Sequence, residues 1–300
     1  MIRHLSLVLA LGLTSFAQAA PHGILPTFSK LKSPSVLNQT RIGDNASKLV
    51  YYGGPVIGNV KIYTVFWGDH VNATVTKGIG DFFSTTVNST YMDWLSEYNT
   101  NLKAVDGREG TQQKIGRGTY VSEIQITPAN VKTDLLNEEI QAELDHQIAL
   151  GKLPKPDANS LYMIFFPPGI TIAVDGAKSC QQLCAYHEGF VSPSHGNIFY
   201  GVMPDMDGAC RLGCGFQPAY FDSVTEVTAH ELIEAVTDPF PTPGDKPAYP
   251  QAWNTTKGEE IGDLCSAHDT TLTTKGLTYV LQQEFDNQTQ ACAPGPYQSP

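Results

Sequence analysis

The sequence predicts a single domain of the α/β or α+β class, in which helices pack on a mixed sheet and disulfide bonds crosslink the chain. Three observations predict it. Strand-like apolar runs alternate with amphipathic segments between residues 49 and 300. The same stretch contains no fixed-period repeat and no Gly/Ser linker that would separate two domains. The six cysteines, an even number, are typical of a crosslinked exported chain.

The first 48 residues have the composition of segments that precede a folded domain. Residues 1–20 combine a basic start, an apolar run and the cleavage pattern Ala17-Gln18-Ala19, which predicts a secretory signal peptide. Residues 21–48 are rich in Pro, Ser, Lys and Asn without a clear period, which predicts a flexible leader or a propeptide. No later apolar run approaches the length of a membrane span. We therefore expect a secreted protein, extracellular or in the cell wall, with one globular domain at residues 49–300.

Apolar patterning predicts the elements of this domain in chain order. β-Branched and aromatic runs predict the strands, and apolar residues at helical spacing predict the helices. The predicted strands are 59–68, 118–126, 160–166 and 197–203, followed by a hairpin at 271–285. The predicted helices are one interrupted or two short helices at 77–98, a clear amphipathic helix at 131–150 and a helix at 223–239.

The net charge narrows the classes of binding partner, and the sequons predict a modification. The chain has 30 acidic and 19 basic residues, a formal net charge of -11. An acidic surface excludes nucleic acid and anionic membranes as expected partners and is compatible with bound cations. Six N-x-S/T sequons predict a glycoprotein. They lie at Asn38, Asn45, Asn72, Asn88, Asn254 and Asn287.

The cysteines form two C-x-x-x-C pairs and two single positions. This spacing would suggest zinc in a cytosolic chain, but behind a signal peptide it predicts disulfide bonds. Fifteen pairings of six cysteines are possible, and the sequence does not choose among them. The residues concerned are Cys180, Cys184, Cys210, Cys214, Cys265 and Cys292.

The predicted helix at 223–239 is the one stretch where ionisable residues gather at a useful spacing. Ser223 followed by Glu226 has the pattern of a capping box, and Pro239 marks the end of the helix. One face is apolar, whereas the opposite face carries a histidine and three acids with no Lys or Arg among them. Like charges four residues apart and an acid at the helix C-terminus disfavour a merely solvated face. A solvated or structural face remains the alternative to a metal-binding one.

The acidic face contains the pattern His230-Glu231-x-x-Glu234, which differs from the zinc motif H-E-x-x-H in its last residue. One helical turn places His230 beside Glu234 as metal ligands, with Glu231 as the general base that activates water. Further ligand candidates are Glu260, Asp263, His187 and Asp238. Zinc suits this mixture of imidazole and carboxylate, whereas calcium would suit the carboxylates alone.

The order of these motifs resembles the EXORDIUM-like, or phosphate-induced protein 1, family over residues 50–292. The resemblance is carried by Tyr52-Gly-Gly-Pro55, Phe66-Trp67-Gly68, Cys180-x-x-x-Cys184-Ala-Tyr-His187, the helix from Ala229 to Pro239 and Glu260-Ile-Gly-Asp263-Leu-Cys265. It implies an exported protein of the apoplast or cell wall that is associated with growth. A fainter resemblance, through the helix and the preceding sheet, is to zincin metallopeptidases, and it implies a zincin-like fold and a third ligand downstream of the helix.

Three function classes follow. The first is a metal-dependent, peptidase-like hydrolase that acts on a peptide or a cell-wall component. The second is a non-catalytic cell-wall or growth-signalling protein of EXORDIUM type. The third is a carbohydrate-active or carbohydrate-binding protein. No serine-hydrolase elbow, dinucleotide fingerprint or phosphate-binding loop is present in the sequence.

Overall fold

The structure is a computed structural model that describes residues 24–26, 48–215, 217–241 and 246–299. Several predictions fall on other residues. The signal peptide, most of the leader and the sequons at Asn38 and Asn45 lie outside the described residues.

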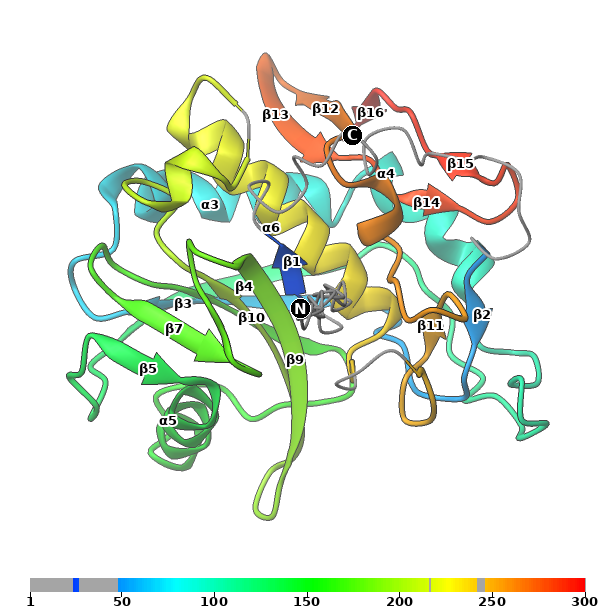
Figure 1. The fold of residues 1–300 in the computed structure, drawn as a ribbon, viewed down its shortest axis with the longest axis horizontal. Coiled ribbons are helices and arrows are strands. Elements are labelled where there is room, and N and C mark those ends of the chain that lie inside the picture. Colours follow the sequence, from blue (N-terminus) through cyan, green and yellow to red (C-terminus); the bar gives the residue numbers. More distant parts are fainter. Residues whose placement is uncertain (1–23, 27–47, 216, 242–245, 300) are drawn as a thin grey trace, which may run out of the picture.

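A six-stranded mixed sheet is the centre of the fold (Figure 1). Its inner strands β3, β6 and β10 are parallel, and β4 extends the parallel part on one side. On the other side β9 runs antiparallel to β10, and the short strand β1 runs antiparallel to β9 at the edge. The strands, in their order across the sheet, are β1 (Ile24–Pro26), β9 (Leu183–Ser192), β10 (Gly196–Met203), β6 (Ser160–Phe165), β3 (Lys61–Trp67) and β4 (Thr119–Ile126).

Helices cover both faces of this sheet, so its central strands are buried on both sides. Helix α5 (Asn137–Ala149) and a small sheet of β5 (Asp134–Leu136), β7 (Thr171–Val174) and β8 (Ala177–Lys178) cover one face. Helices α3 (Ala73–Thr86) and α6 (Tyr220–Thr237) cover the other. The side chains of β3 show the alternation: Ile62 faces the α3 and α6 side, whereas Val65 faces α5.

Shorter elements complete the domain on the α6 side. The hairpin of β12 and β13 packs beside α6, and the chain between α3 and β4 begins with a short helical stretch. They are α4 (Thr90–Asp93), η2 (Trp94–Tyr98), η3 (Cys210–Leu212), η4 (Asp263–Cys265), β2 (Val50–Tyr51), β11 (Trp253–Asn254), β12 (Asp269–Thr274), β13 (Leu277–Gln282), β14 (Phe285–Asp286), β15 (Ala291–Cys292) and β16 (Tyr297–Gln298).

The expected mixed α/β class, the single compact domain and the predicted strands and hairpin are confirmed, whereas three details differ. The helix expected at 131–150 begins only at Asn137, because the preceding residues form β5. Helix α6 begins at Tyr220 after the cap residue Ala219, so Ser223 and Glu226 lie inside the helix and form no capping box. Strand β9 was not predicted at all, although it is the longest strand described.

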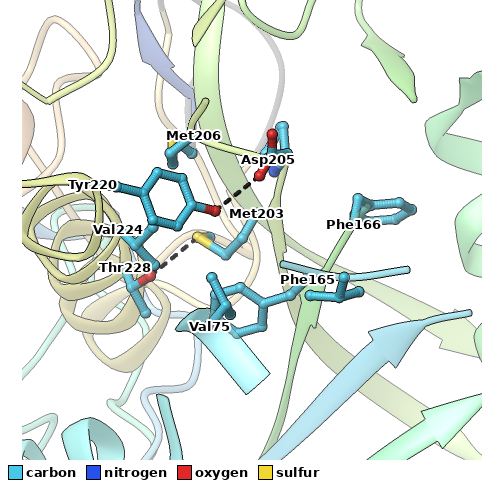
Figure 2. A pocket seen from close by; sticks show the side chains of 11 residues that line it. Val75, Phe165, Phe166, Met203, Asp205, Met206, Tyr220, Val224 and Thr228 are labelled. Carbon is cyan, nitrogen blue, oxygen red and sulfur yellow. Dashed lines mark hydrogen bonds between the residues drawn. The ribbon is translucent and has the colours of Figure 1, made fainter. Parts of the chain in front are cut away.

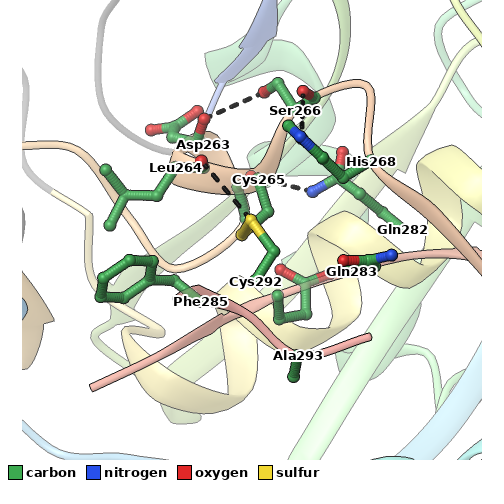
Figure 3. Close-up of a disulfide and its surroundings, with 12 residues drawn as sticks. Asp263, Leu264, Cys265, Ser266, His268, Gln282, Gln283, Phe285, Cys292 and Ala293 are labelled. Carbon is green, nitrogen blue, oxygen red and sulfur yellow. Dashed lines mark hydrogen bonds between the residues drawn. A yellow bond between two sulfur atoms is a disulfide. The ribbon is translucent and has the colours of Figure 1, made fainter. Parts of the chain in front are cut away.

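All six cysteines are paired, which resolves the open connectivity. Cys180 bonds Cys210 and Cys184 bonds Cys214, so two bridges tie β9 and the segment before it to the segment before α6. The third bridge, Cys265–Cys292, ties η4 to β15 (Figure 3). Loops of about 30 residues closed in this way are each worth roughly 3–4 kcal/mol in the chain-entropy description. The segments that surround α6 are therefore held by covalent bonds.

Two of the four described sequons have a buried asparagine. Asn254 is fully buried and its amide donates to the carboxylate of Asp238. The amide of Asn287 is also buried and exchanges two hydrogen bonds with the backbone of Leu49. A glycan on either amide nitrogen would displace the hydrogen bond that this nitrogen donates. Asn72 and Asn88 are at least partly exposed.

No helix among the described residues is long and apolar enough to cross a membrane.

Candidate metal centre

Helix α6 carries the candidate residues through the interior of the domain. Every residue from Ser223 to Thr237 is buried, because β9 and β10 lie on one side and β13 on the other. The solvated face, which the sequence left open as the alternative to a metal-binding face, is therefore excluded: both faces of the helix are covered. The side chains of His230, Glu231 and Glu234 have no exposed surface. Buried charges are costly unless they are paired or bind a metal, so this face needs compensation.

His187 reaches this face from the middle of β9. Its Nε2 donates to the carbonyl oxygen of Asp238 (3.1 Å), which leaves Nδ1 as the ring atom with a free lone pair. Nδ1 lies 3.1 Å from Oε2 of Glu231 and 3.7 Å from Oε2 of Glu234. A lone pair that faces two carboxylate oxygens requires a proton or a cation between them.

His230 is oriented by the end of the β12–β13 hairpin. The Nε2 amide of Gln282 lies 2.8 Å from Nδ1 of His230 and donates to the carbonyl oxygen of Gly262 (2.9 Å). Nδ1 of His230 is thus an acceptor, and the ring proton belongs on Nε2. Nε2 lies 3.0 Å from Oε2 of Glu234, one helical turn further along α6.

Glu234 is held by the backbone of the segment that leads into η4. Its Oε1 accepts hydrogen bonds from the N–H groups of Gly262 (3.2 Å) and Asp263 (3.1 Å). Its Oε2 consequently faces both histidines. Gly262 is needed for this approach, because a Cβ there would lie 2.5 Å from Nδ1 of His230 and 2.9 Å from Oε1 of Glu234.

The remaining predicted ligands divide into two groups. Oε1 of Glu260 lies 3.5 Å from Nε2 of His187, so Glu260 belongs to the cluster. Asp263 and Asp238 use their carboxylates elsewhere: Asp263 accepts from the N–H of Glu260, and Asp238 accepts from the N–H of Ala252 and the amide of Asn254. These two aspartates hold neighbouring segments, and Asp238 contributes its carbonyl group rather than its carboxylate to the cluster.

Two overlapping groups of three residues have the spacing of metal ligands. One is His187, Glu234 and Glu260, and the other is His230, Glu231 and Glu234; in each, the candidate ligand atoms lie within 4.8 Å of one another. Several of these atoms have no hydrogen-bond partner of good geometry, namely Nε2 of His230, Oε1 of Glu231 and Oε2 of Glu234. No lysine or arginine among the described residues forms a salt bridge with these carboxylates.

Burial and mutual repulsion shift the carboxyl groups of the cluster. Burial raises the pKa of Glu260 and of Glu284 well above the usual range. For the same reason the pKa of Asp238 is raised to about 7 and that of Asp263 to about 8. The cluster holds more carboxyl groups than its histidines can balance as ions.

The pKa values of Glu234 and of the two histidines shift in the directions that favour a negative Glu234 beside positively charged histidines. Burial alone raises the pKa of Glu234, but the charges of His230 and His187 and the N–H of Asp263 outweigh it and lower that pKa overall. Burial alone lowers the pKa values of both histidines, yet the adjacent carboxylates raise them well above the usual value, led by Glu260 for His187 and by Glu234 for His230. The site therefore favours a carboxylate at Glu234 and positive charge around it.

Three residues of the site were not predicted from the sequence. Gln282 orients His230, Gly262 permits its approach to Glu234, and Glu284 adds a further buried carboxyl group whose Oε1 lies 2.8 Å from the hydroxyl of Tyr91. Gln282 and Glu284 stand at the end of the predicted hairpin, so polar residues in a strand packed on the core were the available signal. Gly262 had no signal beyond its place between two predicted ligands.

A small cavity beside the first half of α6 is separate from this cluster (Figure 2). Its volume is about 10 Å³, room for about one water molecule. Tyr220 donates to Asp205 at its rim, and the hydroxyl of Thr228 contacts the sulfur of Met203 (Figure 2). None of the candidate ligands lines this cavity.

Comparisons with known proteins give no relative: no family model, no curated protein and no solved structure matches the chain.

Proposed function

We propose that the chain is a metal-dependent hydrolase whose cation is held at Glu234. The observation that carries the proposal is the position of Oε2 of Glu234, a buried oxygen with no hydrogen-bond partner of good geometry that lies 3.0 Å from Nε2 of His230 and 3.7 Å from Nδ1 of His187. Orphaned buried polar atoms of this kind are costly, and an ion would satisfy several at once.

The donor set fits a small divalent cation that accepts both imidazole and carboxylate, such as zinc. His187 has the arrangement of a ligand histidine, because Nε2 donates to a backbone carbonyl and Nδ1 faces the carboxylate oxygens of Glu231 and Glu234. Glu234 is likewise fixed through its second oxygen. His187 and Glu234 are therefore our preferred ligands, and Glu260, which lies on the Nε2 side of His187, joins them by its spacing. Calcium prefers oxygen ligands alone and suits this set less well.

His230 fits a ligand role less well than the H-E-x-x-E pattern implies. To ligate through Nε2, its Nδ1 would have to carry the proton and donate to an oxygen of Gln282. Turning the amide of Gln282 would then place that oxygen against the carbonyl of Gly262. We assign His230 to holding Glu234 through Nε2–H instead.

Glu231 is the proposed general base. Its Oε2 lies 3.1 Å from Nδ1 of His187, its Oε1 has no hydrogen-bond partner of good geometry, and burial raises its pKa, which makes it a better proton acceptor than an ordinary carboxylate. A bound divalent cation would supply Lewis acidity at the carbonyl under attack. Glu231 would take the proton from water, and peptide or amide bonds are the proposed substrates.

The second candidate is a non-catalytic exported protein in which the same residues share protons. The raised pKa of Glu231 lets it donate to Nδ1 of His187, and His230 donates to Glu234, so protons could satisfy these pairs without a metal. The resemblance to the EXORDIUM-like family favours this function and a place in the cell wall. A carbohydrate-directed function has no comparable observation in its favour.

Elemental analysis of the purified protein separates the two candidates. We expect about one zinc ion per chain, lost in Glu234→Gln, because both groups of ligands share this residue. Glu226→Gln, one of the buried acids earlier on the same helix, should retain the metal. A protein that contains no metal even after incubation with zinc would contradict the proposal and favour the non-catalytic candidate.

The catalytic part is tested with Glu231→Gln. Removing a general base should lower peptide hydrolysis by about 100-fold or more, while the metal content stays unchanged. Hydrolysis of a peptide library is measured by mass spectrometry, with Glu226→Gln as the matched control. Full activity in Glu231→Gln would show that Glu231 is not the base.

A further inference from the structure

The outer edge of β9 is occupied by a short strand from the N-terminal segment of the same chain. In β1, Ile24 pairs with Tyr186, Leu25 with Ala185 and Pro26 with Leu183, and the two strands are antiparallel. The register shifts between Leu25 and Pro26, where β1 ends. All the other strands of the sheet come from residues 61–203, so β1 is an addition to a sheet that is complete without it.

The occupied edge lies next to the proposed catalytic residues. His187, whose ring contacts Glu231, directly follows Tyr186 on β9. Helix α6 also contacts β1, and Figure 1 shows β1 (dark blue) beside both β9 and α6. A segment bound along this edge therefore passes the cluster.

The pairing of β1 has the features of a replaceable strand. It contains three residues, and its last, Pro26, has no N–H to donate to a ladder. Ordering each residue of β1 costs about 1–2 kcal/mol of backbone entropy, and a strand of three residues makes too few hydrogen bonds to offset that cost. An exposed strand edge presents unpaired N–H and C=O groups, and extended peptides bind such edges through main-chain hydrogen bonds.

We propose that the edge of β9 from Leu183 to His187 binds an extended peptide, and that residues 24–26 are an internal stand-in that blocks it. This inference rests on the proposed function and names its substrate class: the peptide is the substrate of the hydrolase. The antiparallel register fixes its direction. The peptide residue that precedes the one paired with Tyr186 lies opposite His187, so the bond to be cleaved is next to that position and near Glu231.

The test uses the full chain with Ile24→Pro and Leu25→Pro together, which removes the backbone donors of β1. The matched control is Ile24→Ala with Leu25→Ala, which keeps them. The probe is a fluorescent peptide with the sequence of residues 21–30, and binding is followed by anisotropy. Because the internal strand competes at high effective concentration, we expect the proline variant to bind about tenfold or more tightly than the unmodified chain and the alanine control. The same peptide N-methylated at the residues that correspond to Ile24 and Leu25 should not bind.

Equal binding by the proline and alanine variants, or equal binding of the N-methylated peptide, would overturn the proposal. If the proline variant does not fold, hydrogen exchange of the unmodified chain decides: the amides of Ile24 and Leu25 should exchange much faster than those of β10, and equal protection would contradict a replaceable strand. The metal measurement is independent. A protein that binds the peptide but contains no metal would refute the hydrolase and support the peptide-binding edge. A protein that contains the metal but does not bind the peptide would refute the peptide-binding edge and leave the hydrolase standing.

Discussion

Glu234 has one oxygen on two backbone N–H groups and the other between two histidines. The sequence predicted the histidine and the acids of α6 as a group, because helical spacing alone places His230 beside Glu234. It did not predict which nitrogen each histidine would offer. That depends on the carbonyl of Asp238 and on the amide of Gln282, which approach from other elements and leave no periodic trace in the sequence.

Gly262 lies close to the side chains of both His230 and Glu234. In Gly262→Ala the new methyl group would collide with His230 and Glu234, whose positions are fixed by packing, so we expect a loss of about 1–3 kcal/mol in the free energy of unfolding and loss of bound metal. Chemical denaturation and elemental analysis measure the two effects.

The control is Gly116→Ala. A Cβ at Gly116 meets only the side-chain nitrogen of Asn59, at 3.1 Å, and this variant should keep both stability and metal. A Gly262→Ala protein with unchanged metal content would show that the close approach is not needed for the site.

At the scale of elements, the strands and helices with a clear period were predicted and those without one were missed. Strand β6 is a continuous apolar run and was recognised, whereas β9 mixes Cys, His, Glu and Gly and has no alternation. Tertiary contacts explain why β9 shows no alternation. Helix α6 packs on one face of β9, α5 shares a hydrophobic cluster with its other face, and β1 pairs with its edge. A Cβ at Gly189 would lie 2.4 Å from the carbonyl oxygen of Pro239. His187 was named as a candidate, but the strand that positions it was not.

Tyr91 connects α4 to the hairpin that carries Gln282. Its buried hydroxyl lies 2.7 Å from the carbonyl oxygen of Gln282 and 2.8 Å from Oε1 of Glu284. Tyr91→Phe leaves both acceptors buried, so we expect a loss of about 1–3 kcal/mol in the free energy of unfolding. Tyr249→Phe, at an exposed tyrosine, is the control and should cost little. Equal stabilities of the two variants in urea would contradict this connection.

The whole molecule is closed by contacts between its N-terminal half and its last residues. Tyr98 donates to the carbonyl of Phe285, Asn287 exchanges hydrogen bonds with Leu49, and Glu97 accepts from the N–H of Asn287. The sequence indicated that the final segment folds back on the core, and its apolar residues do join that core. The partners could not be predicted, because each contact joins positions far apart in the chain.

Glu97 makes this closure dependent on pH. Burial, and then the nearby Asp286, raises the pKa of Glu97 to about 7. A carboxyl group with a raised pKa favours folding in its protonated form, so its contribution is complete below the unfolded pKa of about 4.3 and is lost as the pH rises through about 7. Relative to wild type, Glu97→Gln should therefore become more stable as the pH increases over this range.

Urea unfolding at several pH values measures the difference. The control Gln288→Asn, at an exposed position, removes no titratable group and should show an offset that does not change with pH. A constant offset for Glu97→Gln as well would indicate that its carboxyl group titrates normally in the folded protein.

The pairing of Leu25 with Ala185 also has a consequence for the order of folding. The N-terminal segment is synthesised first, but its partner strand is made after most of the sheet, and a contact between such distant positions forms late because a long loop must close. The earliest part of the chain would thus be the last to join the sheet. If the stretch that follows β1 were cut once the domain had formed, the cut would release a strand on which no earlier step of folding depends.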